Sequence, residues 1–270
     1  MVYLTGDTHG DIDRFKHGKL RWLGKRDTVV VLGDFGFVWD GSKEEQKKLD
    51  WLRKRPYTLL FLDGSHENYD LLKQYPTEER FGGKVQALGG NVYHVCRGSV
   101  LELENKKYLC FGGAESQDVE DREPGVNWWK EEMPSKEEME YALASLDTVD
   151  WEVDAVVTHC APKLIQRKIA SWYENDQMTS FLDRICSDLK FKKWYFGHYH
   201  IDRQIDDKFF ALFNNVSFIK YCVISKKHSS MLNLSILSVY SNSKLYNLLE
   251  YSLYTLKFEG NIFISGHLIL

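Results

Sequence analysis

Residues 28–36 read TVVVLGDFG, a short apolar run that ends abruptly in a polar cluster. The same succession occurs at 1–11 (MVYLTGDTHGD), 58–68 (TLLFLDGSHEN), 154–162 (DAVVTHCAP) and 193–200 (KWYFGHYH). Runs this short, rich in Val, Leu, Tyr and Phe, predict buried strands rather than helices. Each polar cluster therefore stands at the carboxyl end of a predicted strand.

Helical segments separate several of these strands, at 11–23, 43–55, 66–75 and from about residue 136. Ser135 and Glu138 form a capping-box pattern at the start of the last one. Strand, polar loop, helix and strand in succession predict an α/β fold with its site at the carboxyl ends of the strands.

The stretch 92–113 (VYHVCRGSVLELENKKYLCFGG) has a different pattern. It predicts antiparallel strands joined by a turn at Asn105–Lys107. Combined with the strand–helix units, it predicts mixed β-sheets, two of them packed face to face with helices outside.

The composition describes an ordinary globular protein. The 270 residues are 43% hydrophobic and 27% charged, and the net charge of -4 gives no reason to expect nucleic acid or an anionic membrane as a partner. The mixed charges of 43–55 indicate a solvated helix face, not a nucleic-acid patch. Five cysteines without a CxxC pair suit reduced thiols in a cytoplasm. The first residues do not resemble a signal peptide, and no apolar run is long enough for a membrane span. We therefore expect a cytoplasmic protein.

Acidic and imidazole side chains stand at the ends of the predicted strands: Asp7, His9, Asp34, His66, His159, His198 and His200. A single Asp or His at a strand end is usually a cap or a satisfied turn residue. A whole set at the strand-to-loop junctions of one domain is difficult to explain as capping. Mixed imidazole and carboxylate ligands suit Mn, Fe or Zn. A carboxylate such as Asp34, with ligands on both sides, can bridge two ions.

The order of these motifs resembles the calcineurin-like metallophosphoesterases. It runs Asp7-Thr8-His9, Gly33-Asp34, Gly64-Ser65-His66-Glu67, His159 and Gly197-His198-Tyr199-His200. The resemblance extends from residue 4 to about residue 213. It implies a four-layer αββα sandwich, two packed mixed β-sheets flanked by helices, over a domain at 1–215, with a dinuclear metal site between the sheets.

The resemblance also implies roles for individual residues. One ion would be held by Asp7, His9, Asp34 and His200. The other would be held by Asp34, His159 and His198, with Ser65 standing where the family has an asparagine ligand. His66 would protonate the leaving oxygen or stabilise its charge, and Glu67 would orient His66. The nucleophile would be a hydroxide activated by the two metal ions, of which manganese is expected first, with iron or zinc as alternatives.

Two departures from the family pattern concern the substrate and the second ion. The motif GDFGFVWDG (33–41) lacks the Val-Asp-Arg-Gly of protein Ser/Thr phosphatases and symmetrical dinucleoside tetraphosphatases, so a phosphate-clamping arginine is missing. The opening GDTHG (6–10) does resemble those enzymes, and the two motifs therefore disagree. Ser65 has a shorter side chain than asparagine and a neutral hydroxyl, so it is a poorer ligand for a hard cation.

The stretch 111–135 is polar, contains glycine and carries the adjacent Trp128 and Trp129. One interpretation is a surface loop whose tryptophans close an edge of the core. The other is a lid over the metals, with Arg122 or Arg97 binding a non-reacting phosphate oxygen.

Residues 216–270 form a C-terminal extension of uncertain order. They contain no Asp, Arg, Pro or Trp and keep neither strand nor helix periodicity for long. An added layer, a segment that binds a protein partner, and a sequence not shaped for this fold all remain open.

The sequence thus predicts a hydrolase that cleaves a phosphate mono- or diester of small size. The alternative is a catalytically weakened homologue that binds a nucleotide or a protein. Ser65 and the unusual tail favour the alternative, whereas the otherwise complete ligand set favours the enzyme.

Overall fold

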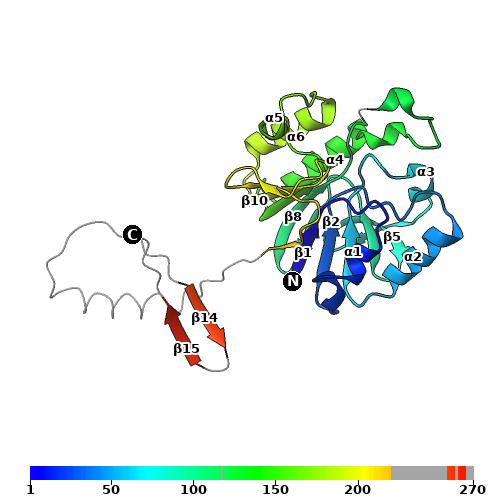
Figure 1. Ribbon diagram of the computed structural model, residues 1–270. Coiled ribbons are helices and arrows are strands. Elements are labelled where there is room, and N and C mark those ends of the chain that lie inside the picture. The colour runs from blue at the N-terminus through cyan, green and yellow to red at the C-terminus, as the bar shows by residue number, and fades with distance from the viewer. Residues whose placement is uncertain (117, 220–253, 259–260, 266–270) are drawn as a thin grey trace. The chain divides into compact units, whose positions relative to one another are not determined.

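The computed structural model describes residues 1–116, 118–219, 254–258 and 261–265 (Figure 1). It comprises a compact unit, Met1–Lys220, and a second unit, Tyr221–Leu270. In the second unit, β14 (Tyr254–Phe258) and β15 (Asn261–Ser265) form an antiparallel pair. Most of the predicted tail lies outside the described residues. No helix among the described residues is long and apolar enough to cross a membrane.

The first sheet of the compact unit has seven strands in the order β13-β1-β2-β3-β6-β5-β4. The neighbours β1, β2, β3 and β6 are parallel, and the remaining pairs are antiparallel. The strands are β1 (Val2–Thr5), β2 (Thr28–Val31), β3 (Thr58–Phe61), β4 (Thr77–Arg80), β5 (Gly83–Gly89), β6 (Val92–Val95) and β13 (Ser217–Phe218). Because β13 pairs with β1, the compact unit extends past the predicted boundary at residue 215.

The second sheet has six strands in the order β11-β12-β10-β9-β8-β7. Its four inner strands are parallel, and antiparallel strands close both edges. The strands are β7 (Val100–Leu103), β8 (Lys106–Phe111), β9 (Ala155–Thr158), β10 (Lys193–Phe196), β11 (Arg203–Gln204) and β12 (Phe209–Ala211). Both sheets are mixed, as predicted.

The stretch 92–113 does not form one antiparallel run, because β6 belongs to the first sheet and β7 and β8 to the second. The chain passes between the sheets at Cys96–Ser99. The turn that joins β7 to β8 consists of Glu104 and Asn105, both with positive φ (53° and 57°). A two-residue turn of this kind matches the twist of the paired strands, so β8 begins within the predicted turn, at Lys106.

Helices flank the sheets: α1 (Asp13–Lys16), η1 (Leu20–Trp22), α2 (Lys43–Arg53), α3 (Tyr69–Leu72), η2 (Val119–Asp121), η3 (Lys130–Glu132), α4 (Lys136–Asp147), α5 (Lys163–Ile169) and α6 (Gln177–Asp188). The capping box at Ser135 and Glu138 is present. The predicted helix at 11–23 is broken near Gly18, which has a φ of 57°. The predicted helix at 66–75 begins only at Tyr69, because Asn68 accepts the N–H of Leu71 and caps it.

Alternation along the strands creates the layers. Val30 on β2 packs into a core between the two sheets, whereas Val29 and Val31 pack with residues of α1 and α2. On β8, Tyr108 and Cys110 join the same central core, while Leu109 and Phe111 join the core beneath α4, α5 and α6. Side chains of successive strand residues point to opposite faces, so each sheet has one face on its partner and one on helices (Figure 1). The αββα sandwich is confirmed.

Candidate metal centre

The loops after five strands, three in one sheet and two in the other, carry the predicted ligands to one place. Asp7 and His9 follow β1, Asp34 follows β2, Ser65 and His66 follow β3, His159 follows β9, and His198 and His200 follow β10. Glycines permit the close approach of these loops. A Cβ on Gly64 would lie 2.1 Å from Asp34 Oδ1, and one on Gly197 would lie 2.2 Å from Asp7 Oδ1.

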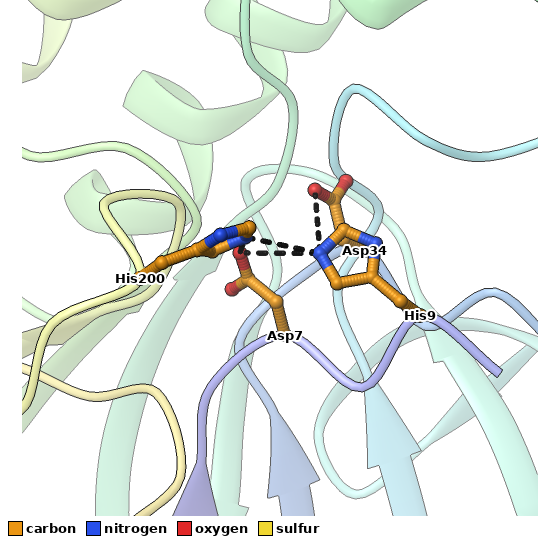
Figure 2. Close-up of side chains that lie close together, drawn as sticks. All are labelled: Asp7, His9, Asp34 and His200. Atoms are coloured by element: carbon orange, nitrogen blue, oxygen red, sulfur yellow. Dashed lines mark hydrogen bonds and ion pairs between the residues drawn. The ribbon is translucent and has the colours of Figure 1, made fainter. Parts of the chain in front are cut away.

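Asp7, His9, Asp34 and His200 form the first group (Figure 2). One ligand atom from each lies within 4.8 Å of the others. His200 Nε2 is 3.1 Å from Asp7 Oδ2, and His9 Nε2 is 3.8 Å from Asp34 Oδ2. The two carboxylates are buried and the two imidazoles are exposed. The group is therefore anchored in the protein and open to solvent on its histidine side.

His159 and His198 extend this group past Asp34. His159 Nε2 is 3.5 Å from Asp34 Oδ1, and the rings of His159 and His198 are 5.0 Å apart. His159 Nδ1 is 2.7 Å from the Leu32 carbonyl oxygen. Because a carbonyl only accepts, Nδ1 must carry the proton, which leaves a lone pair on Nε2.

The Nε2 atom of His159 is buried and has no hydrogen-bond partner among the described residues. A buried acceptor without a partner is unfavourable unless another group satisfies it. An imidazole whose Nδ1–H is fixed by a carbonyl, and whose free Nε2 faces a carboxylate, is the usual arrangement of a metal-binding histidine. The residues present thus fit a divalent cation between His159 and Asp34.

The electrostatics of the group also suit cation binding. Burial lowers the pKa of His198 to about 4, so this imidazole is neutral at pH 7 and its lone pair is free to bind. Burial alone would raise the pKa of Asp7, but the neighbouring imidazole of His159 and the hydrogen bonds from His200 and the His198 main-chain N–H outweigh burial and lower it. Asp7 is therefore ionised at neutral pH.

The backbone at this centre is strained. His9, Asp34, His198 and His200 have φ values of 44°, 44°, 65° and 49°. The left-handed region costs a residue with a side chain about 1–3 kcal/mol, and such residues gather at functional sites. Four candidate ligands share this unfavourable conformation. This indicates that the loops adopt it to position the side chains of the site, because it does not favour local stability.

His66 lies at the edge of the centre, beside Arg122. The main-chain N–H of His66 donates to Asp34 Oδ1 at 2.8 Å, and its ring Nε2 is 3.5 Å from Arg122 Nη2. Arg122 also pairs with Asp118 at 2.8 Å. Burial lowers the pKa of His66, and Arg122 acts in the same direction. Of the two arginines predicted to bind phosphate, Arg122, in the stretch 111–135, thus lies beside His66.

Glu67 and Arg97 have other surroundings than we expected. Glu67 Oε1 accepts the N–H of Phe35 at 2.6 Å, so it fixes the backbone after Asp34 rather than the His66 ring. Burial raises the pKa of Glu67 well above its ordinary value. Arg97 is 3% exposed, and its guanidinium donates to Asp63, to Glu138 and to main-chain carbonyls. These bonds direct it away from a phosphate at the centre.

Two supporting residues were not predicted from the sequence. The Phe213 ring stacks on His200, with centroids 4.5 Å apart and planes at 19°. Arg14 donates to the Phe213 carbonyl at 2.5 Å and to the Asp7 carbonyl at 3.4 Å. Arg14 therefore ties the loop after β1 to the segment after β12 that packs on His200. Neither residue lies in a sequence motif. Their place at the centre follows from the sheet order, in which β1 lies next to β13 near the end of the compact unit.

Two packed mixed sheets with a group of Asp and His side chains at their strand ends, able to hold a metal ion, are the arrangement of a metallophosphoesterase. A comparison with protein-family models matches residues 1–202 to calcineurin-like phosphoesterases. The match covers most of the chain, and the chain belongs to the calcineurin-like phosphoesterase family. A comparison with curated proteins found no match to the chain.

Proposed function

We propose that this protein hydrolyses a phosphate mono- or diester of a small molecule at a centre of two divalent cations, in the cytoplasm. The observation that carries the proposal is the free, buried Nε2 of His159 opposite Asp34 Oδ1, because Asp34 also belongs to the Asp7, His9 and His200 group. A carboxylate with imidazole ligands on both sides is suited to bridge two cations.

Asp7, His9, Asp34 and His200 would hold one ion, and Asp34, His159 and His198 the other, with Ser65 beside it. Mixed imidazole and carboxylate ligands favour manganese, with iron or zinc as alternatives. When bound, the two ions would supply positive charge to the phosphate oxygens and lower the pKa of a water molecule.

His66 and Arg122 would act on the organic side of the phosphate. Arg122 Nη2 faces His66 Nε2, so the imidazole proton is assigned to Nδ1. A neutral His66 would donate this N–H to the leaving oxygen and stabilise the charge that develops there. Arg122, held by Asp118, would reach a non-reacting phosphate oxygen.

A catalytically weakened homologue is the second candidate. Ser65 favours it, because this buried serine replaces a family ligand. Such a protein would keep the fold to bind a nucleotide or, through its tail, a protein partner.

Metal analysis and turnover separate the two candidates. With added Mn²⁺, we expect the chain to bind two ions and to hydrolyse p-nitrophenyl phosphate or bis(p-nitrophenyl) phosphate. Two bound ions without hydrolysis of either ester would favour the binding protein. Hydrolysis that persists in Asp34→Asn would exclude the proposed centre.

A further inference from the structure

A cavity of about 370 Å³ adjoins the metal centre on the side of α2. His9 and His66 line one end of it, and Trp39, Asp40 and Lys48 line much of the rest. We call it the Trp39 pocket. Its volume falls in the range of small-molecule sites. Because His66 belongs both to the centre and to this pocket, a substrate whose phosphate lies on the ligands has room for one substituent here.

The wall of the Trp39 pocket is rigidly built. The buried carboxylate of Glu45 accepts the main-chain N–H groups of Trp39, Asp40 and Gly41, the last at 2.8 Å. Asn68 Nδ2 donates to the Trp39 carbonyl at 2.7 Å. The Trp39 indole also packs edge to face on Trp129, with centroids 5.7 Å apart. The indole is therefore fixed before any ligand arrives.

These same contacts disfavour a second phosphate. Consecutive main-chain N–H groups in a turn before a helix are a common phosphate site. Here Glu45 already occupies them. Asp40 and Glu44 add further negative charge to the lining, and the pocket's ammonium group, on Lys48, donates to the Gly10 carbonyl at 3.2 Å. The pocket suits a neutral group that carries N–H and O–H donors for the two carboxylates.

An aromatic wall, carboxylate acceptors and an excess of negative charge together match a nucleoside. Its base has a face that stacks on an indole, and its amino and hydroxyl groups donate hydrogen bonds. We propose that the Trp39 pocket binds the leaving group of the reaction and that this group is a nucleoside, so that the substrate is a nucleoside phosphate ester without a second phosphate on the leaving side. This inference rests on the proposed function, because it assigns the leaving oxygen to His66.

The reaction balances without a further reactant. Water adds to phosphorus, the bond from phosphorus to the nucleoside oxygen breaks, and that oxygen takes up a proton. A nucleoside monophosphate thus gives inorganic phosphate and a nucleoside.

The test compares substrates that differ only at the leaving group, with the whole chain in Mn²⁺. We expect kcat/KM for adenosine 5′-monophosphate to exceed that for ribose 5-phosphate at least about tenfold, the size expected of one base on an aromatic ring. It should also exceed that for adenosine 5′-diphosphate, although the diphosphate has the better leaving group. Trp39→Ala should lower the ratio of adenosine 5′-monophosphate to ribose 5-phosphate at least about fivefold. The control Trp22→Ala, at a tryptophan that is 78% exposed, should leave this ratio unchanged.

Equal kcat/KM values for adenosine 5′-monophosphate and ribose 5-phosphate would overturn the inference, while hydrolysis of p-nitrophenyl phosphate would still support the proposed function. If no ester is hydrolysed, the proposed function fails and the leaving-group role of the pocket fails with it, and calorimetric binding then tests whether the pocket binds a nucleoside. Tighter binding of adenosine 5′-monophosphate than of ribose 5-phosphate, lost in Trp39→Ala, would support the pocket. Equal binding of the two would refute it.

Discussion

Arg97 and Asp63 form a buried ion pair that joins the loop of His66 to the loop of Arg122. Arg97 Nε donates to Asp63 Oδ2 at 2.7 Å, and its Nη2 donates to the main-chain carbonyls of Glu131 and Glu132 at 2.7 and 3.2 Å. Asp63 in turn accepts the Gly113 N–H on its carbonyl at 2.8 Å. The residue before Gly64 is thus tied to both ends of the stretch that carries Arg122.

Loss of Arg97 should destabilise the fold strongly. Arg97→Met leaves the Asp63 carboxylate buried without its cation, which costs about 3–5 kcal/mol in the free energy of unfolding. Urea denaturation at pH 7 measures it. Lys47→Met breaks the exposed pair with Glu44 and serves as the control, with an expected change of less than about 0.5 kcal/mol. If both substitutions lower the free energy of unfolding by a similar, small amount, the buried pair does not stabilise the fold.

Glu132 should make stability fall as pH rises. Burial raises its pKa to about 7, and its Oε2 accepts the Ser116 hydroxyl at 2.6 Å. The folded protein therefore holds this proton more tightly than the unfolded chain, so the contribution is complete below about pH 4.5 and is lost as pH rises through 7. Urea denaturation should show the wild type losing up to roughly 3 kcal/mol relative to Glu132→Gln between pH 5 and pH 8. Parallel pH profiles for the two proteins would refute the shifted pKa.

The gathering of the candidate ligands in one place was predictable, because each of them follows a predicted strand. Asp7, Asp34, His159 and His198 each follow an apolar run, and the ends of parallel strands meet at one edge. The two-sheet fold was equally predictable from the strand pattern and the family resemblance. The division of 92–113 between the two sheets could not be predicted. A short link between strands of different sheets has the same composition as a link between strands of one sheet.

Residues whose role depends on long-range contacts could not be predicted. Arg97 is an ordinary arginine in the sequence, and its partners Asp63 and Glu132 lie more than 30 positions away on either side. Glu67 follows His66 directly, yet its carboxylate bonds to Phe35. Trp39 lies in the motif at 33–41, in which the sequence pattern drew attention only to the absence of an arginine. Asp and His adopt the left-handed conformation more often than most residues, but the residue type alone does not show that His9 and Asp34 adopt it here.

Asp34 and His66 should have separable functions. Asp34→Asn should abolish hydrolysis and lower bound metal together, because an amide cannot neutralise two cations. His66→Ala should retain metal while slowing turnover by about 10²–10⁴, the usual contribution of an acid–base group. Metal content and kcat in Mn²⁺ are the measurements. Loss of metal in His66→Ala, with an unchanged rate per bound ion, would contradict the assignment.

The end of the compact unit should lie after β13. A chain ending at residue 220 should stay folded and keep its metals, because the ligands and the β1–β13 pairing are all present. A chain ending at residue 215 loses this pairing, and also the packing of Val216 and Ile219 on the two cores, so it should be less stable by roughly 1–3 kcal/mol. Urea denaturation of the two chains compares them, and equal stability would place the boundary at 215.

Ser65 should make the second ion the weaker one. The residue is 5% exposed and lies between Gly64, whose Cβ position is 2.7 Å from His159 Nε2, and His66. Its hydroxyl is on a shorter side chain than the amide oxygen of asparagine, and a neutral hydroxyl is a poor ligand for a hard cation. An ion beside His159 would therefore keep water in that position, which catalytic metals commonly do.

We expect calorimetric titration with Mn²⁺ to show one tight and one loose site per chain. Ser65→Asn should tighten the loose site and raise turnover at low metal. The control Ser187→Asn, on the exposed face of α6, should change neither. If Ser65→Asn leaves both affinities as they are, Ser65 is already a ligand or the second ion lies elsewhere.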